Sequence, residues 1–214
     1  MVTSLPNLLT LSRIVVIPLV IAAFYIPGDT ARWVACGLFV AAAITDFFDG
    51  YLARAWGETS NLGRFLDPIA DKLLVAAVLL MLAAFQHIGE WSYLPAAVIL
   101  MREILVSGLR EFLAELRVSM PVSKLAKWKT TIQMIALPVL LVGDAGTRLL
   151  NLPIREIGEV CLWVAAVLTL ITGWDYLRAG LKHMREHPAP PPNLAIQAKA
   201  AEADTRKNAG AGQG

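Results

Sequence analysis

Two pairs of aspartates are the residues in this sequence best placed to do chemistry. Asp46 and Asp49 are three residues apart near the end of one apolar stretch, and Asp67 and Asp71 are four apart at the start of the next. If these segments are helical, the members of each pair fall on one face. Carboxylates on one face beside a membrane repel each other and are costly to desolvate, so a cation is expected between them.

If the two faces meet, their four carboxylates form a ligand set for hard divalent cations. Mg²⁺ and Mn²⁺ prefer oxygen ligands and commonly bridge substrate phosphates. Two such ions ~3.5–4 Å apart stabilise a transferring phosphoryl group and its leaving oxygen. Gly50 and Ala53 leave room for a ligand near the backbone, and Arg54 and Arg64 can neutralise phosphate charge. The sequence therefore predicts phosphoryl transfer at a site with two divalent ions, Mg²⁺ or Mn²⁺.

Taken one at a time, these residues have ordinary explanations. A single acidic residue at a helix end is usually solvated, and glycine and alanine often pack membrane helices together. The complete set is harder to explain in this way, because a chance match to all its positions has a probability below about 10⁻⁹ per start position. The set consists of Asp46, Asp49, Gly50, Ala53, Arg54, Gly63, Asp67 and Asp71.

The elements that must position these residues are apolar helices. The 214 residues are 57% hydrophobic, with a mean hydropathy of +0.58, and several apolar runs approach the ~20 residues that cross a bilayer. We expect an all-α, polytopic membrane domain over residues 1–186 and a disordered Pro/Ala/Gly-rich tail over residues 187–214. About six spans are expected: Leu8–Tyr25, Trp33–Leu52, Pro68–Phe85, Leu94–Phe112, Thr131–Val142 with some preceding residues, and Ile157–Leu177. The fifth has the weakest hydropathy, because Lys127 and Lys129 lie at its start.

Basic residues indicate the orientation of the chain. They concentrate in the segments after the second and fourth spans, which the positive-inside rule assigns to the cytoplasm together with both termini and the aspartates. These residues are Arg54, Arg64, Lys72, Arg110, Arg117, Lys124, Lys127 and Lys129, against Arg32, Arg148 and Arg155 on the opposite side. The net charge of only +2 gives no general basic field, and no nucleic-acid partner is expected.

A second cluster of charge indicates an anionic acceptor. Arg102 and Arg110 are eight residues apart, or about two turns along one helix face, and Lys127 and Lys129 follow at the same membrane side. Arginine forks suit phosphate, and lysine supplies a point charge. The alternative is ordinary positive-inside charge that contacts anionic lipid.

The aspartate pattern D-x2-D-G-x2-A-R-x8-G-x3-D-x3-D resembles the signature of the CDP-alcohol phosphatidyltransferase family. The resemblance implies that Asp46, Asp49 and Asp67 bind two metal ions, and that Asp71 lies close to the metals and is the general base. It also implies that the small residues and the first arginine of the signature surround the CDP moiety. The CDP-lipid set is Asn7, Thr10, Arg13, Gly50, Ala53, Arg54 and Gly63, the first three by a weaker likeness.

Segments 5–13, 102–111 and 123–134 are similar to those of bacterial phosphatidylglycerophosphate synthases within that family. The likeness implies transfer of the phosphatidyl group of CDP-diacylglycerol to sn-glycerol 3-phosphate, with release of CMP. The acceptor phosphate would contact Arg102, Arg110, Lys127 and Lys129. A homodimer in the lipids of the bacterial inner membrane is expected by the same likeness.

Four other functions are alternatives for parts of the pattern. A synthase that makes cardiolipin from phosphatidylglycerol, or one that uses an inositol phosphate, would share the signature. An ion-coupled transporter also places acids in membrane helices, but its acids are expected at the midplane rather than at one end. An inactive scaffold would not need the intact set of eight residues.

Overall fold

The computed structural model describes residues 5–56, 61–115 and 124–186, and their regular structure is entirely helical. The prediction of an all-α protein is therefore confirmed. The predicted tail, residues 187–214, and Arg117 lie outside the described residues. The helices are α1 (Leu5–Phe24), α2 (Asp29–Trp56), α3 (Asn61–Ala84), the 3₁₀ helix η1 (Glu90–Ser92), α4 (Tyr93–Glu115), α5 (Lys124–Leu150) and α6 (Ile154–Glu186).

The chain divides into two units, and the boundary falls within α6. The first unit, Met1–Trp174, contains α1 to α5 and the first part of α6. The second unit begins at Asp175 and contains the remainder of that helix up to Glu186. All residues of the predicted site lie in the first unit.

Three described segments are long and apolar enough to cross a membrane: Glu90–Ala114, Lys127–Leu150 and Ile154–Leu181. A shorter apolar segment, Leu9–Phe24, lies in α1. These segments agree with the membrane protein predicted from the sequence. The fifth span, which was expected to have the weakest hydropathy, is among the three. That span was predicted to end at Val142. Helix α5 instead resumes after a break at Gly143, where φ is 40° and ψ is −120°, and continues to Leu150.

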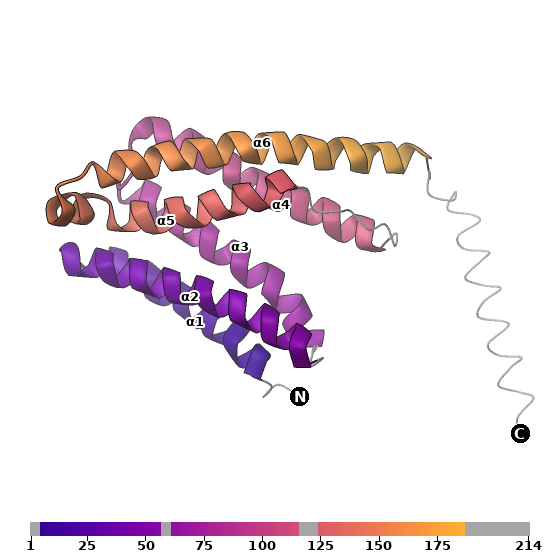
Figure 1. Ribbon diagram of the computed structural model, residues 1–214, viewed down its shortest axis with the longest axis horizontal. Coiled ribbons are helices and arrows are strands. Elements are labelled where there is room, and N and C mark those ends of the chain that lie inside the picture. The colour runs from indigo at the N-terminus through magenta and orange to yellow at the C-terminus, as the bar shows by residue number, and fades with distance from the viewer. Residues whose placement is uncertain (1–4, 57–60, 116–123, 187–214) are drawn as a thin grey trace, which may run out of the picture. The chain divides into compact units, whose positions relative to one another are not determined.

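The core of the first unit is formed by buried apolar side chains from all six described α-helices. Helix α1 packs against α2 and α3, α5 packs against α2, and α3 contacts α4 and α5 (Figure 1). Helices α5 and α6 approach closely at Gly158, where an added Cβ would lie 2.7 Å from Leu140 Cδ2. Each helix contributes at least one fully buried apolar side chain. Examples are Val20, Phe39, Val78, Ile99, Leu140 and Leu162.

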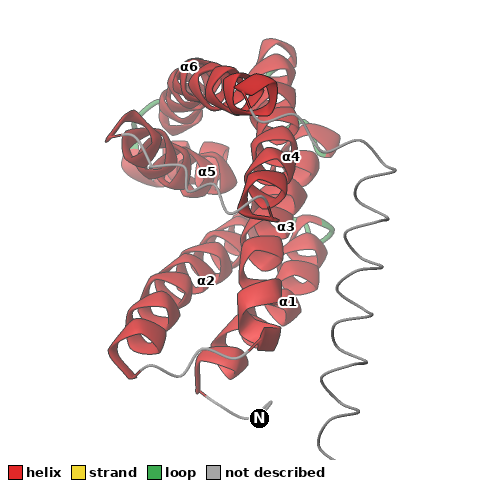
Figure 2. Ribbon diagram, turned by 90° about the vertical axis from the view of Figure 1, so that its right-hand side faces the viewer, coloured by secondary structure: helices red, strands yellow, loops and turns green. Residues whose placement is uncertain are grey.

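The helices alternate in direction, which brings the predicted site residues to one end. The starts of α1, α3 and α5 lie at the same end of the unit as the last residues of α2 and α4 (Figure 1). Figure 2 views the chain from the side of this end. Because Asp46 is near the end of α2 and Asp71 near the start of α3, the alternation itself places both aspartates at this end.

Ion pairs join the helices at the opposite end. Arg32 of α2 bonds Asp144 of α5 (3.3 Å), and Arg148 bonds both carboxylate oxygens of Asp29. Hydrogen bonding to Arg148 holds the pKa of Asp29 below its ordinary value. The predicted far-side arginines Arg32 and Arg148 are thus paired with acids, as is Arg155, which contacts Glu159 at 3.2 Å.

Glu159 of α6 ties the start of α4 to the same end. Its carboxylate accepts hydrogen bonds from the backbone N–H of Gly89 (2.9 Å) and from Ser92 Oγ (2.8 Å). Nearby, the ring of His87 stacks on Phe24, with ring centroids 5.3 Å apart. Burial lowers the pKa of the His87 imidazole to about 4, and the charge of Arg32 acts in the same direction. This end is therefore held together by charges that offset one another and by a neutral histidine.

Candidate active site

The four aspartates of the sequence pattern lie on two neighbouring helical segments. Asp46 and Asp49 belong to the C-terminal part of α2, and Asp67 and Asp71 belong to the first turns of α3. Both helices pack against α1. The structure describes the side chains of Asp46 and Asp71. Outside the described side chains lie those of Asn7, Asp49, Ala53, Arg54 and Asp67, and likewise the surroundings of Gly50 and Gly63.

Arg13 of α1 is the partner of the first aspartate. Its side chain is only 1% exposed and forms an ion pair with Asp46, whose side chain is 46% exposed. A buried guanidinium is destabilising unless a charge or hydrogen bonds compensate it, so the pair fixes α1 against α2 at this point. Thr10, three residues before Arg13, is also buried. Of the residues that the sequence assigned to the nucleotide end, Arg13 is therefore positioned beside Asp46.

Asp71 is exposed, and charges from four other helices act on it. Asp46 of α2 and Glu103 of α4 are negative, whereas Arg13 of α1 and Lys129 of α5 are positive. The first five helices thus each contribute a charged group to one region. Because Asp46 and Asp71 repel each other, a cation bound between them would be stabilised by both.

A cavity of about 280 Å³ lies along α4 at the same end. Arg102 and Arg110, which the sequence placed on one helix face, both line this cavity. Its charged lining carries three cations and two carboxylates. The lining residues are Lys72, Arg102, Glu103, Val106, Ser107, Arg110, Glu111 and Ala114. The cavity offers an anionic ligand of small size several hydrogen-bond donors with positive charge.

Glu103 and Arg102 join α4 to α5 and α6. Lys129 is 4% exposed and forms an ion pair with Glu103, whose carboxylate also lies 3.5 Å from Arg102 Nη1. Arg102 Nη2 donates a hydrogen bond to Thr172 Oγ1 at 3.1 Å. A Cβ added at Gly173 would lie 3.0 Å from Arg102 Cγ, so the arginine stem packs closely against α6 at this glycine.

The two predicted lysines of α5 occupy different environments. Lys129 is buried in the group with Glu103 and Arg102, whereas the side chain of Lys127 is exposed. Residues two positions apart in a helix are separated by about 200° around its axis, so Lys127 and Lys129 cannot face the same partner. Of the pair, Lys129 is the one that the structure brings to Arg102.

Comparison with known proteins identifies the family. A profile of the CDP-alcohol phosphatidyltransferases matches residues 3–171. The chain belongs to the CDP-alcohol phosphatidyltransferase family. Among its relatives, a Rickettsia felis protein is 51% identical over 84% of this chain and 97% of its own length. A Cereibacter sphaeroides protein is 40% identical and a Pectobacterium atrosepticum protein 43% identical, each over 86% of this chain and 98% of its own length. All three are named CDP-diacylglycerol–glycerol-3-phosphate 3-phosphatidyltransferase.

CDP-alcohol phosphatidyltransferases use divalent metal ions, and the described residues of this chain fit such an ion. The donor atoms of Asp46 and Asp71 are carboxylate oxygens, which Mg²⁺ and Mn²⁺ prefer. Both side chains are accessible, and the repulsion between them favours a cation. Asp49 and Asp67 add two further carboxylates on the same helices.

The structure adds residues to the cavity that the sequence analysis did not assign to the site. Lys72 appeared in the sequence only as a loop charge, and Ser107 and Glu111 had no role. A signal for the α4 residues was present, because Glu103, Ser107, Arg110, Glu111 and Ala114 recur at helical spacing along one face. No comparable signal exists for Lys72, because its place in the cavity depends on how α3 packs against α4.

Proposed function

We propose that this chain transfers the phosphatidyl group of CDP-diacylglycerol to sn-glycerol 3-phosphate and releases CMP. The observation that carries the proposal is that the basic cavity along α4 and Asp71 share a charged neighbour. Glu103 both lines that cavity and acts electrostatically on Asp71. An acceptor that carries both a phosphate and a hydroxyl suits a site with cations on one side and a carboxylate on the other. The relatives' names agree with this reaction.

In the proposed reaction, Asp71 is the general base. It takes the proton of the attacking hydroxyl of the acceptor, whose oxygen forms a bond to the β-phosphorus of the CDP-lipid. The bond from this phosphorus to the bridging diphosphate oxygen breaks, and CMP leaves with the electron pair. Positioning of the two substrates and electrostatic stabilisation are expected to supply most of the rate enhancement, because the protein forms no covalent bond to the substrate in this reaction.

Two divalent ions, Mg²⁺ or Mn²⁺, would be held by Asp46, Asp49, Asp67 and Asp71. When bound, they supply charge neutralisation at the diphosphate and polarisation of the reacting oxygens. Around the CDP-lipid we place Asn7, Thr10, Arg13, Gly50, Ala53, Arg54 and Gly63. Arg13 would orient Asp46 through its ion pair, since it is buried too deeply to reach far from that carboxylate.

The acceptor phosphate would bind the cations that the sequence selected. Arg102 and Arg110 line the cavity, and Lys129 forms an ion pair with Glu103, which also lines it. Lys127 is retained in the set as an exposed charge that attracts the anion. Because Glu103 already neutralises part of this group, the acceptor phosphate competes with a carboxylate for Lys129. That competition would limit the affinity for anions in general and favour a ligand that also makes the other contacts.

The cellular setting of the proposed enzyme follows from its substrates and from charge. We propose a multi-pass protein of the bacterial inner membrane, with both termini and the active site on the cytoplasmic side. The catalytic membrane domain would extend over residues 1–186, followed by the tail 187–214. Surrounding membrane lipids and a second copy of the chain in a homodimer are its proposed partners.

Acceptor specificity of the purified protein tests this function. The full chain, in mixed micelles with CDP-diacylglycerol and Mg²⁺ or Mn²⁺, would be offered glycerol 3-phosphate, phosphatidylglycerol and inositol phosphate in parallel. We expect CMP release and phosphatidylglycerophosphate only with glycerol 3-phosphate. Turnover with phosphatidylglycerol but not with glycerol 3-phosphate would refute the proposal.

A further inference from the structure

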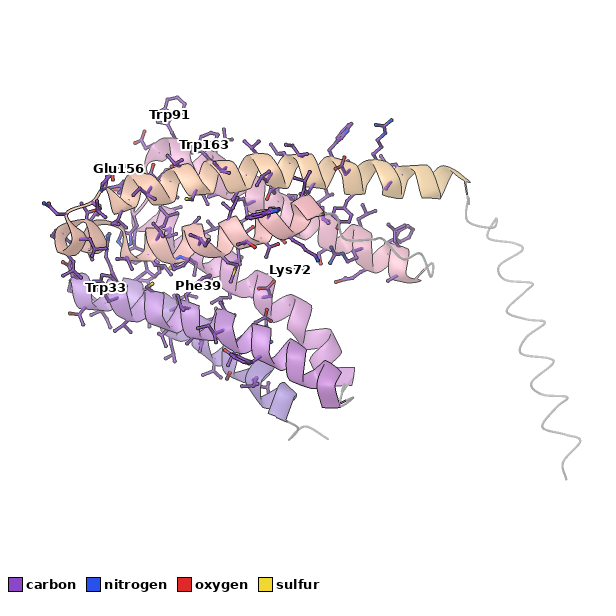
Figure 3. All side chains as sticks on the ribbon, in the orientation of Figure 1. Trp33, Phe39, Lys72, Trp91, Glu156 and Trp163 are labelled. Atoms are coloured by element: carbon purple, nitrogen blue, oxygen red, sulfur yellow. The ribbon has the colours of Figure 1, made fainter. Side chains whose placement is uncertain are left out.

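Lys72 is a cation of the α4 cavity that has no role in the proposed reaction. It belongs to α3 (Figure 3) and follows Asp71 directly in the sequence. The other cations that line the cavity, Arg102 and Arg110, both belong to α4. Lys72 therefore brings positive charge to this cavity from a second helix.

The partner of Lys72 is a neutral hydroxyl group. Its Nζ donates a hydrogen bond to Ser107 Oγ, which in turn lies 3.4 Å from Glu111 Oε1. A hydroxyl carries no charge of its own to neutralise the ammonium group, whereas a phosphate oxygen would accept the same hydrogen bond and also supply negative charge. Ser107 can then keep Glu111 as its acceptor. The ammonium group is thus directed into the cavity by a contact that an anionic ligand can replace.

Because Lys72 is next to Asp71 in the chain, it could also hold the acceptor near the proposed base. A phosphate held by Lys72 on one side and by Arg102 or Arg110 on the other would bridge α3 and α4. The acceptor would then be anchored to the helix that carries the proposed base, one residue away from it. Such an anchor restricts where the attacking hydroxyl can lie relative to Asp71, which is the condition for a high effective concentration.

We propose that Lys72 is a substrate-binding residue that contacts the phosphate of a small phosphorylated polyol acceptor. The inference rests on the proposed function, because it concerns the same cavity. It differs from the sequence-based set in adding a contact from α3 to those from α4 and α5. A lysine that only joins α3 to Ser107 would contribute to stability without discriminating between acceptors.

Steady-state kinetics of three variants of the full chain test the proposal. Lys72→Gln is expected to raise KM for glycerol 3-phosphate by about 10- to 100-fold, the range for a lost charge-assisted hydrogen bond. KM for CDP-diacylglycerol should stay within about twofold, and Lys72→Arg should recover most of the affinity because it retains the charge. Arg148→Gln removes an exposed cation at the opposite end of the first unit, where it pairs with Asp29, and should leave all constants unchanged. An unchanged KM for glycerol 3-phosphate in folded Lys72→Gln would overturn the proposal.

A second measurement uses the unmodified protein and does not depend on turnover. Lys72 would be acetylated with acetic anhydride and quantified by peptide mass spectrometry, with glycerol 3-phosphate, glycerol or no addition. Protection by glycerol 3-phosphate and not by glycerol supports a phosphate contact, and lack of protection at saturating glycerol 3-phosphate overturns it. If glycerol 3-phosphate protected Lys72 but was not turned over, the binding inference would stand and the proposed reaction would fail.

Discussion

Removal of the Glu103 carboxylate should destabilise the protein more than removal of its partner Lys129. In Glu103→Gln, Lys129 remains 4% exposed and faces Arg102 without the carboxylate that separates the two positive charges. In Lys129→Met, Glu103 keeps Arg102, whose Nη1 lies 3.5 Å from its carboxylate. Loss of either partner of this ion pair should therefore lower the stability by different amounts, because Glu103 has a second cation, Arg102, whereas Lys129 is left beside a like charge.

The magnitudes follow from the burial of each charge. Loss of one partner of a buried pair typically costs about 3–5 kcal/mol. Because the glutamine amide still accepts a hydrogen bond, we expect about 2–3 kcal/mol for Glu103→Gln. For Lys129→Met we expect about 1 kcal/mol or less, since a neutral thioether is well tolerated in a buried position. At about 2–4 °C per kcal/mol for a chain of this size, Tm should fall by roughly 4–12 °C in the first variant and by less than about 4 °C in the second.

Thermal unfolding in one detergent, followed by intrinsic fluorescence, measures both values. The double variant completes a cycle, and it should be more stable than Glu103→Gln alone because it removes the unpaired lysine. A larger loss of Tm in Lys129→Met than in Glu103→Gln would refute the reasoning. So would a double variant less stable than either single variant.

Three further results are expected. Asp71→Asn should lower kcat by at least about 10²-fold, the effect of a lost general base, with Tm retained; near-normal turnover would remove Asp71 from the mechanism. EDTA should abolish transfer and added Mg²⁺ or Mn²⁺ should restore it, so activity that persists in EDTA would exclude the proposed metal site. His87 has a pKa of about 4 in the folded chain, below its ordinary 6.5, so the unfolded chain binds more protons between these values. Tm should therefore be highest above about pH 6.5 and fall towards pH 4, and His87→Phe, which can still stack on Phe24, should flatten this part of the profile.

The sequence predicted the helical fold because its signals are local. An apolar run of sufficient length requires a helix in a membrane, whatever lies beside it. Two carboxylates at helical spacing share a face wherever the helix is placed. The end of the fifth helix did not follow from the apolar run. The prediction ended at Val142, where that run stops, but α5 resumes after the backbone break at Gly143 and continues to Leu150 through Asp144, Thr147 and Arg148.

By itself, the sequence determined the all-α membrane class, the pairs of acids on two helical faces and the two-turn spacing of Arg102 and Arg110. The tertiary structure alone decided which distant residues meet. Arg13 lies against Asp46, Lys129 rather than Lys127 joins Glu103, and Lys72 reaches Ser107 across the cavity. Periodicity along a helix states which residues share a face, but it does not state what that face contacts. The contacts depend on helix packing, which side chains far apart in the chain set together.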